Sequence, residues 1–98
     1  MPDFRLSAAA AAKLRVILRE SEIKFGRHQT GLYHAGFVKT FELLSLFPGI
    51  ALRVDHLRSG YRRYRFESHI IFFTVEKDHI LIRDLFHAAQ NITKDMLR

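Results

Sequence analysis

The sequence predicts one α+β domain in which two helices pack on one face of a mainly antiparallel sheet. Its 98 residues leave room for a single hydrophobic core, so we expect one domain over 1–98. Helical patterns fill most of the first half, and three β-rich segments fill much of the second half. Helices followed by strands are typical of an α+β layout. The expected order of elements is therefore β-α-α-β-β-β.

The first half is expected to form a short strand and a helical hairpin. Residues 3–6 alternate in polarity as a strand does, and Ser7 then fits the N-cap of a helix that Gly26 ends. A second helix is predicted over about 29–47, where Pro48 stops it. The residues expected on the buried sides of the two helices are Leu14, Ile17, Leu18, Ser21, Phe25, Tyr33, Phe37, Phe41, Leu44 and Phe47.

The second half is expected to supply the rest of the sheet. The strands predicted from their β-branched and aromatic residues are Tyr61–Phe66, His69–Val75 and His79–Phe86. Residues 76–78 are a polar hairpin turn, and 50–58 are expected to be an irregular or extended connection. The tail, 91–98, is predicted to form one or two helical turns with Asn91 as a cap. The helices would cover one face of the sheet and leave the other only partly covered.

Composition and charge favour a soluble cytoplasmic protein with an acidic partner. The chain has no cysteine, which disfavours a small secreted domain, and it opens without a basic and apolar leader. No apolar run approaches the roughly 20 residues that a membrane span needs, so no membrane association is expected. Sixteen Lys and Arg against ten Asp and Glu give a net charge of +6. That charge favours nucleic acid or an acidic protein segment as partner, although a solvated basic surface also accounts for it.

Basic residues are densest around the first strand of the second half. They are Arg53, Arg58, Arg62, Arg63 and Arg65. Because side chains alternate along a strand, Arg63 and Arg65 would share a face with Tyr61, and Arg62 would share the other face with Tyr64. Arginine alternating with aromatic residues suits nucleic acid, through stacking and phosphate pairing, or an acidic peptide. Alternatively, these charges only keep an edge strand soluble.

His87 and Arg83 are the candidates for catalysis. His87 follows the last predicted strand, and an imidazole that titrates near neutral pH suits a general acid or base. Alternation places Arg83 and His87 on one face, whereas Arg62 and Arg63 point to opposite faces. A histidine bonded to the backbone near the strand end is the structural alternative. The other histidines lack metal-ligand spacing, and cysteine and a glycine-rich phosphate loop are missing, so no metal or other cofactor is expected.

Two apolar residues of the first predicted helix fall outside its buried stripe. Val16 and Ile23 are seven residues apart, so they lie on one side of that helix. They are either a contact strip for a partner or peripheral residues of the core.

Five segments in order resemble the ParE toxins of the ParE/RelE superfamily. They are Arg5–Ala10, Leu44–Gly49, Leu57–Arg63, Ser68–Phe73 and Leu85–Ile92. In that family a Leu-Arg-x-Gly turn opens one strand, a Ser-His segment forms the next, and a Leu-His segment closes the sheet. This sequence departs from the family pattern at Phe73, where many relatives have Tyr, at Phe86, where Leu is usual, and at Asn91, where Asp is common.

The resemblance implies the toxin of a type II toxin–antitoxin system, which inhibits DNA gyrase by binding and blocks replication without turning over a substrate. A ParD-like antitoxin with an acidic C-terminal segment would neutralise it, and such toxins often pair within their complexes. The residues expected to bind gyrase are Arg58, Arg62, Arg63, Arg65 and His87. Those expected to bind the antitoxin are Val16, Ile23, Arg63 and Arg65.

Two alternatives stay open within the superfamily. A RelE-like toxin would be a ribosome-dependent mRNA endonuclease and would use His87 and Arg83 in catalysis, although the ParE-like segment over 68–73 speaks against it. A non-toxic relative would only bind its antitoxin.

Overall fold

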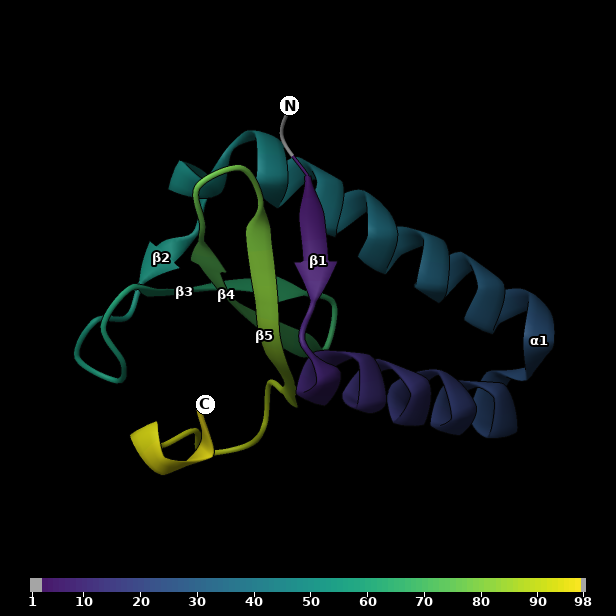
Figure 1. Cartoon of the computed structure of the whole chain (residues 1–98). Coiled ribbons are helices and arrows are strands. Elements are labelled where there is room, and N and C mark those ends of the chain that lie inside the picture. Colours follow the sequence, from purple (N-terminus) through teal and green to yellow (C-terminus); the bar gives the residue numbers. More distant parts are fainter. Residues whose placement is uncertain (1–2, 98) are drawn as a thin grey trace.

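The computed structural model of the protein describes residues 3–97 and packs one mixed sheet against one long helical element (Figure 1). The elements, with η for 3₁₀ helices, are β1 (Phe4–Leu6), α1 (Ala8–Leu46), η1 (Pro48–Ile50), β2 (Leu52–Arg53), β3 (Tyr61–Phe66), β4 (His69–Val75), β5 (Ile80–His87) and η2 (Lys94–Met96). The strand order is β1-β5-β4-β3-β2, with β1 parallel to β5 and the other pairs antiparallel. The predicted α+β class is confirmed. None of the helices described is both long and apolar enough to cross a membrane.

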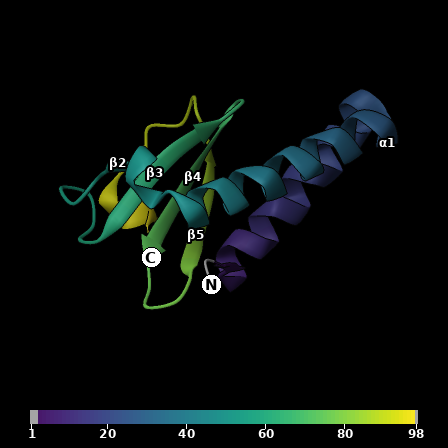
Figure 2. The same ribbon diagram turned by 90° about the horizontal axis from the view of Figure 1, so that it is seen from above.

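The helical half differs from the expected hairpin of two separate helices. α1 is a single element that bends sharply at Gly26, whose φ of 84° and ψ of 174° are not helical. Thr30 Oγ1 donates a hydrogen bond to Ser21 Oγ at 3.0 Å, which joins the stretches before and after the bend close to it. The two stretches overlap when seen from above (Figure 2), and in Figure 1 they diverge toward the sheet. We call them the first arm, 8–25, and the second arm, 27–46. Because glycine adopts a positive φ without strain, the reversal needs no loop residues.

Most strand and cap predictions are confirmed. β3 and β4 have the predicted bounds, and β5 runs one residue later than expected. Ser7 caps α1, because its Oγ accepts a hydrogen bond from Ala10 N–H at 3.1 Å. The connection after α1 contains η1 and the short extended β2. The tail forms only the single turn η2, capped by Thr93 rather than Asn91, and Arg98 lies outside the described residues.

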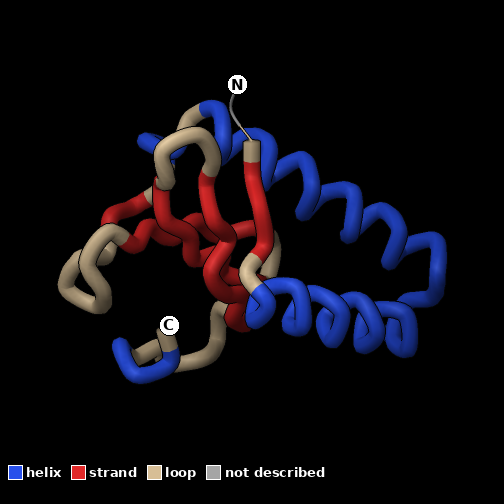
Figure 3. The backbone as a smooth tube through the Cα atoms, viewed as in Figure 1, coloured by secondary structure: helices blue, strands red, loops and turns tan. Residues whose placement is uncertain are grey.

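Both faces of the sheet carry a buried cluster. The cluster under α1 includes Phe37, Phe41, Leu44, Ile71, Phe73 and Ile82. The opposite face carries Val54, Tyr61, Ile70, Phe72, Phe86 and Leu97. The C-terminal segment with η2 lies on this second face, away from α1 (Figure 3). Arg58 fixes that segment, since its Nη1 donates a hydrogen bond to Leu97 O at 3.0 Å.

An extra residue in β5 changes which side chains share a face of the sheet. Phe72 pairs with Asp84 and Phe73 pairs with Ile82, so Arg83 has no partner across the β4–β5 ladder. Such a bulge reverses the alternation of side chains beyond it. Even-numbered residues of β5 join the cluster under α1 before the bulge, and odd-numbered residues join it afterwards.

Candidate functional site

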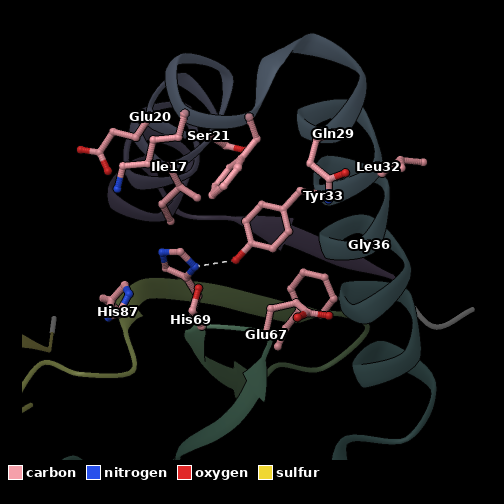
Figure 4. A pocket seen from close by; sticks show the side chains of 14 residues that line it. Ile17, Glu20, Ser21, Gln29, Leu32, Tyr33, Gly36, Glu67, His69 and His87 are labelled. Carbon is pink, nitrogen blue, oxygen red and sulfur yellow. Dashed lines mark hydrogen bonds between the residues drawn. The ribbon is translucent and has the colours of Figure 1, made fainter.

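An open cleft lies between the two arms of α1 and the end of the sheet where β3 turns into β4 (Figure 4). Its volume is about 930 Å³. Small-molecule sites span about 300–1,000 Å³, so the cleft has room for a large side chain or a small ligand. The lining includes Ile17, Glu20, Lys24, Tyr33, His69 and His87. Of these residues, the sequence singled out only His87 as a candidate for function.

Tyr33 and His69 join α1 to the sheet inside this cleft. The Tyr33 hydroxyl lies 2.6 Å from His69 Nδ1. Burial raises the pKa of Tyr33, and burial together with the neighbouring His87 lowers the pKa of His69, so both side chains are uncharged at neutral pH. Phe66 stacks on Tyr33 with ring centroids 5.4 Å apart. The Phe66 ring fits in this position because residue 36 is glycine. A Cβ atom at Gly36 would lie 2.5 Å from Phe66 Cζ.

His87 is held by the residues that follow β5. Ala89 N–H donates a hydrogen bond to His87 Nδ1 at 3.1 Å, and His87 N–H donates one to Gln90 Oε1 at 2.9 Å. Because Nδ1 accepts, a neutral His87 carries its proton on Nε2. Its ring stands edge-on to that of His69, with centroids 5.4 Å apart. This is the backbone-bonded arrangement considered as the structural alternative for His87.

The prediction that Arg83 and His87 share a face is wrong. Arg83 Nε donates a hydrogen bond to Thr74 Oγ1 at 3.1 Å, and its guanidinium lies 5.7 Å from the centre of the Tyr61 ring. Tyr61 belongs to the cluster on the face away from α1, whereas His87 lines the cleft on the α1 side. The physical reason is the bulge at Arg83, which simple alternation along β5 does not anticipate.

Of the arginines predicted to bind gyrase, three lie on β3 and Arg58 lies in the loop before it, and none has a carboxylate partner within the described part of the chain. Arg62 Nη1 donates a hydrogen bond to Ala51 O at 3.4 Å, and Arg65 Nε donates one to Glu67 O at 2.8 Å. Arg58 donates its hydrogen bond to the C-terminal segment, as described above. As predicted, the aromatic residues of β3 divide by face, with Tyr61 on one side and Tyr64 and Phe66 on the other. The basic cluster is therefore distributed over both faces rather than gathered on one.

The apolar candidates on α1 are on the surface. Val16 is 47% exposed and Ile23 is 80% exposed, so neither is a peripheral residue of the core. Phe25 and Phe47 were expected on the buried sides of the helices, and both are exposed instead. Phe25 lies beside the bend at Gly26, and Phe47 follows the last residue of α1, so helical periodicity no longer places them. Among residues 3–97, no group of His, Asp and Glu is arranged to hold a metal ion.

The same fold is found in a solved structure. A solved chain from the chromosomal ParDE toxin–antitoxin system of P. aeruginosa is similar with a TM-score of 0.75. The match covers 89% of this chain and 96% of that chain, at 18% sequence identity. At this identity the likeness shows the fold alone.

Sequence comparisons then show the family. The family model of the ParE toxin of the type II toxin–antitoxin system, parDE, matches residues 4–92. Toxin ParE1 from Caulobacter vibrioides is 35% identical over 91 residues, which cover 93% of this chain and 94% of that protein. The chain belongs to the ParE toxin family.

Proposed function

We propose that this ParE-type toxin inhibits DNA gyrase by binding it, blocks replication and is neutralised by a ParD-like antitoxin in the cytoplasm. The observation that carries the proposal is the family match over residues 4–92, which takes in most of the chain. The identity of 35% with Toxin ParE1, spread over nearly the full length of both chains, adds to it.

Action by binding, rather than by catalysis, accounts for how the charged groups are arranged. A nuclease needs its general acid or base and a stabilising cation at the same phosphate. Arg83 and His87, the pair considered for mRNA cleavage, lie on opposite faces of the sheet. One phosphate group therefore cannot contact both side chains, and this speaks against the RelE-like alternative.

The proposed gyrase-binding surface is the basic outer part of the sheet. It comprises Arg62, Arg63 and Arg65 of β3 and Arg58 of the loop before β3, and His87 at the cleft is a separate candidate contact. A guanidinium group without a carboxylate partner can use its remaining N–H donors to pair with the phosphates or carboxylates of a target. For the antitoxin, the exposed Val16 and Ile23 offer apolar contacts on the first arm. Arg63 and Arg65 would meet its acidic residues.

The order in which synthesis stops tests the proposal. On induction without antitoxin, we expect incorporation of labelled thymidine to fall before incorporation of labelled leucine. The purified chain should also inhibit supercoiling by purified gyrase. Protein synthesis failing first would instead indicate the mRNA endonuclease, and no effect on either would indicate a relative that only binds antitoxin.

Removing the outer arginines tests where gyrase binds. The triple variant carries Arg62→Gln, Arg63→Gln and Arg65→Gln. We expect at least about a tenfold rise in the concentration that half-inhibits gyrase, since each hydrogen bond to a charged group contributes about 1.5–3 kcal/mol. A control that removes the same charge from exposed positions on α1 carries Arg15→Gln, Arg19→Gln and Arg27→Gln. Equal losses in the two variants would mean that net charge matters and that β3 is not the binding surface.

A further inference from the structure

Most of the net charge lies in one short segment. Residues 52–66 contain five arginines and one acidic residue, Asp55, so they carry +4 of the chain's +6. The segment consists of β2, the loop after it and β3, and it lies on the side of the molecule away from the bend in α1 (Figure 1). Because a local excess of positive charge concentrates anionic ligands around it, this segment favours a partner that carries many negative charges.

Four of these arginines are divided between the two faces of the sheet. Residues paired across antiparallel strands share a face, so Arg53 and its partner Arg62 lie on one side. That side faces α1, since the β4 residue opposite Arg62 belongs to the cluster under α1. Arg63 and Arg65 lie on the other side, because their β4 partners belong to the opposite cluster. We call these four residues, with β2 and β3, the basic edge.

Groups within the described residues compete only weakly for the basic edge. Arg53 pairs with Asp55 at 3.0 Å, but both side chains are exposed, and such pairs are weak. Arg65 Nε donates a hydrogen bond to the backbone oxygen of Glu67, whose side chain lines the cleft instead. The Arg63 side chain makes no hydrogen bond or ion pair with residues 3–97. Most N–H donors of these guanidinium groups therefore remain available to a partner.

The aromatic rings of β3 are turned into the two core clusters. Tyr61 is buried in the cluster on the face away from α1, whereas Tyr64 and Phe66 pack against the cluster under α1. Proteins that bind single-stranded nucleic acid combine a basic groove with aromatic side chains on which the bases stack. Because β3 presents no exposed ring, the phosphates of a duplex suit the basic edge better than a single strand does.

Charges on two sides match the grooves of duplex DNA. Each groove is bordered by two phosphate backbones, and the major groove of B-DNA, about 12 Å wide, admits a two-stranded β-ribbon. β2 and β3 form such a ribbon at the edge of the sheet, with arginines on both faces. An acidic peptide running along one face would leave the arginines of the other face unpaired. Double-stranded RNA is also less suitable, because its major groove is deep and narrow.

We propose that the basic edge enters the major groove of duplex DNA, with Arg53 and Arg62 on one phosphate backbone and Arg63 and Arg65 on the other. Contacts with phosphates carry no sequence information, so binding is independent of base sequence. In the inhibited complex the duplex is the DNA on which gyrase acts, and this assignment rests on the proposed function. The toxin then holds the enzyme and its substrate together.

Binding is measured with the purified chain and a short fluorescein-labelled DNA duplex, by fluorescence anisotropy at several salt concentrations. Each phosphate contact contributes about −0.9 to the slope of log affinity against log salt, so contacts by all of the basic edge predict a slope of about −3.6. A duplex of another base sequence should bind equally. The matched single strand and the matched RNA duplex should bind at least about tenfold more weakly, because one side of the edge loses its phosphates. Equal binding of either would overturn the proposal.

Two double variants test the two sides of the basic edge separately. One carries Arg53→Gln and Arg62→Gln, and the other carries Arg63→Gln and Arg65→Gln. Each should make the salt slope shallower by about two, since each arginine on a phosphate contributes about one. If only one pair changed the slope, a single backbone would be contacted and the groove arrangement would be wrong.

Two further variants separate specific contacts from general charge and from damage to the fold. Arg15→Gln with Arg19→Gln removes the same charge from exposed positions on the first arm and should leave the slope unchanged. Arg63→Lys with Arg65→Lys keeps the charge on β3 and should keep the slope of the original chain. An equal reduction in the first-arm variant would mean that net charge alone attracts DNA, which overturns the proposal.

Competition and gyrase inhibition separate the remaining outcomes. Polyglutamate should displace the labelled duplex less well than unlabelled duplex does at equal charge concentration, and equal displacement would assign the basic edge to an acidic protein segment. Inhibition of supercoiling is measured on the same preparations. A chain that inhibits gyrase without binding the duplex would overturn the DNA contact and leave the proposed function intact. A chain that binds the duplex with the expected slopes but leaves gyrase active would support the contact and overturn the proposed function.

Discussion

The two faces of the sheet are covered in different ways. On one face, both arms of α1 supply long side chains to a cluster in which Phe37 and Phe41 are fully buried. On the other face, the cover comes from the segment around Val54 and from the C-terminal segment, which contributes Leu97 and only one helical turn. A cover with so few hydrogen bonds of its own can open without dismantling the sheet. We therefore expect the α1 face to contribute most of the stability, and we expect the cover of the other face to detach separately.

The largest expected effect is on the α1 face. Phe37 is fully buried and its ring lies within 6.0 Å of those of Tyr33, Phe41, Phe66 and His69. Phe37→Ala should lower the free energy of unfolding by about 3–5 kcal/mol, because it removes buried surface and leaves a cavity. Urea unfolding followed by circular dichroism measures this loss. A loss below about 1 kcal/mol would mean that α1 repacks freely and would remove the contrast between the faces.

A smaller effect is expected on the opposite face. Leu97 is as buried as the core phenylalanines, yet Leu97→Ala should cost only about 2 kcal/mol, the low end for such a change. The C-terminal segment can detach instead of enclosing a cavity, so amide exchange should quicken around η2 and stay slow in β4. If the cost matched that of Phe37→Ala and β4 exchanged faster as well, the two covers would be equivalent.

The smallest expected effect is the dependence of stability on pH, which comes from His69 on the α1 side of the sheet. Burial, together with the nearby His87, lowers the pKa of His69 below its ordinary 6.5, and Glu20 opposes this only in part. The unfolded chain therefore binds a proton at higher pH than the folded chain does. Stability should be full above pH 6.5 and fall as the pH drops through the lowered pKa of His69. Asp55 and Asp78, whose pKa values are lowered from 3.8, act only at lower pH.

Urea unfolding at a series of pH values measures this dependence. His69→Gln removes the titrating group and should flatten the profile below pH 6.5. The matched variant His56→Gln changes an exposed histidine outside the cleft and should leave the profile as it is. A profile that stays steep in His69→Gln would assign the proton to another group.

The sheet was predictable from sequence because its strands are punctuated by turn residues. Tyr61–Phe66 and His69–Val75 are bounded by Ser59-Gly60, Glu67-Ser68 and a polar turn, and their bounds were correct. The bulge was missed, although a signal was present. The apolar spacing changes from two residues to three between Ile82 and Leu85, and an inserted residue accounts for that change.

The cleft was much less predictable than the sheet. His69 and His87 both lie in family-like segments, but their pairing depends on the register between β4 and β5. Tyr33 reaches His69 only because α1 turns back on itself, and nothing in the local sequence around Tyr33 indicates a partner 36 residues away. The exposure of Phe25 could not be predicted either, because helical periodicity does not show where a helix extends beyond the core.

The reversal at Gly26 has a consequence for how this part of the chain can change in length. An α-helix turns about 100° with each residue, so one inserted residue between Ser7 and Gly26 would rotate one end of the first arm against the other. Either the Ser7 cap or the contact between Ser21 and Thr30 would then be lost. A connecting loop would absorb such a change, but a one-residue bend cannot. Insertions in the arms should therefore persist only as whole turns added to both arms together. The lengths of the two arms should then change in step.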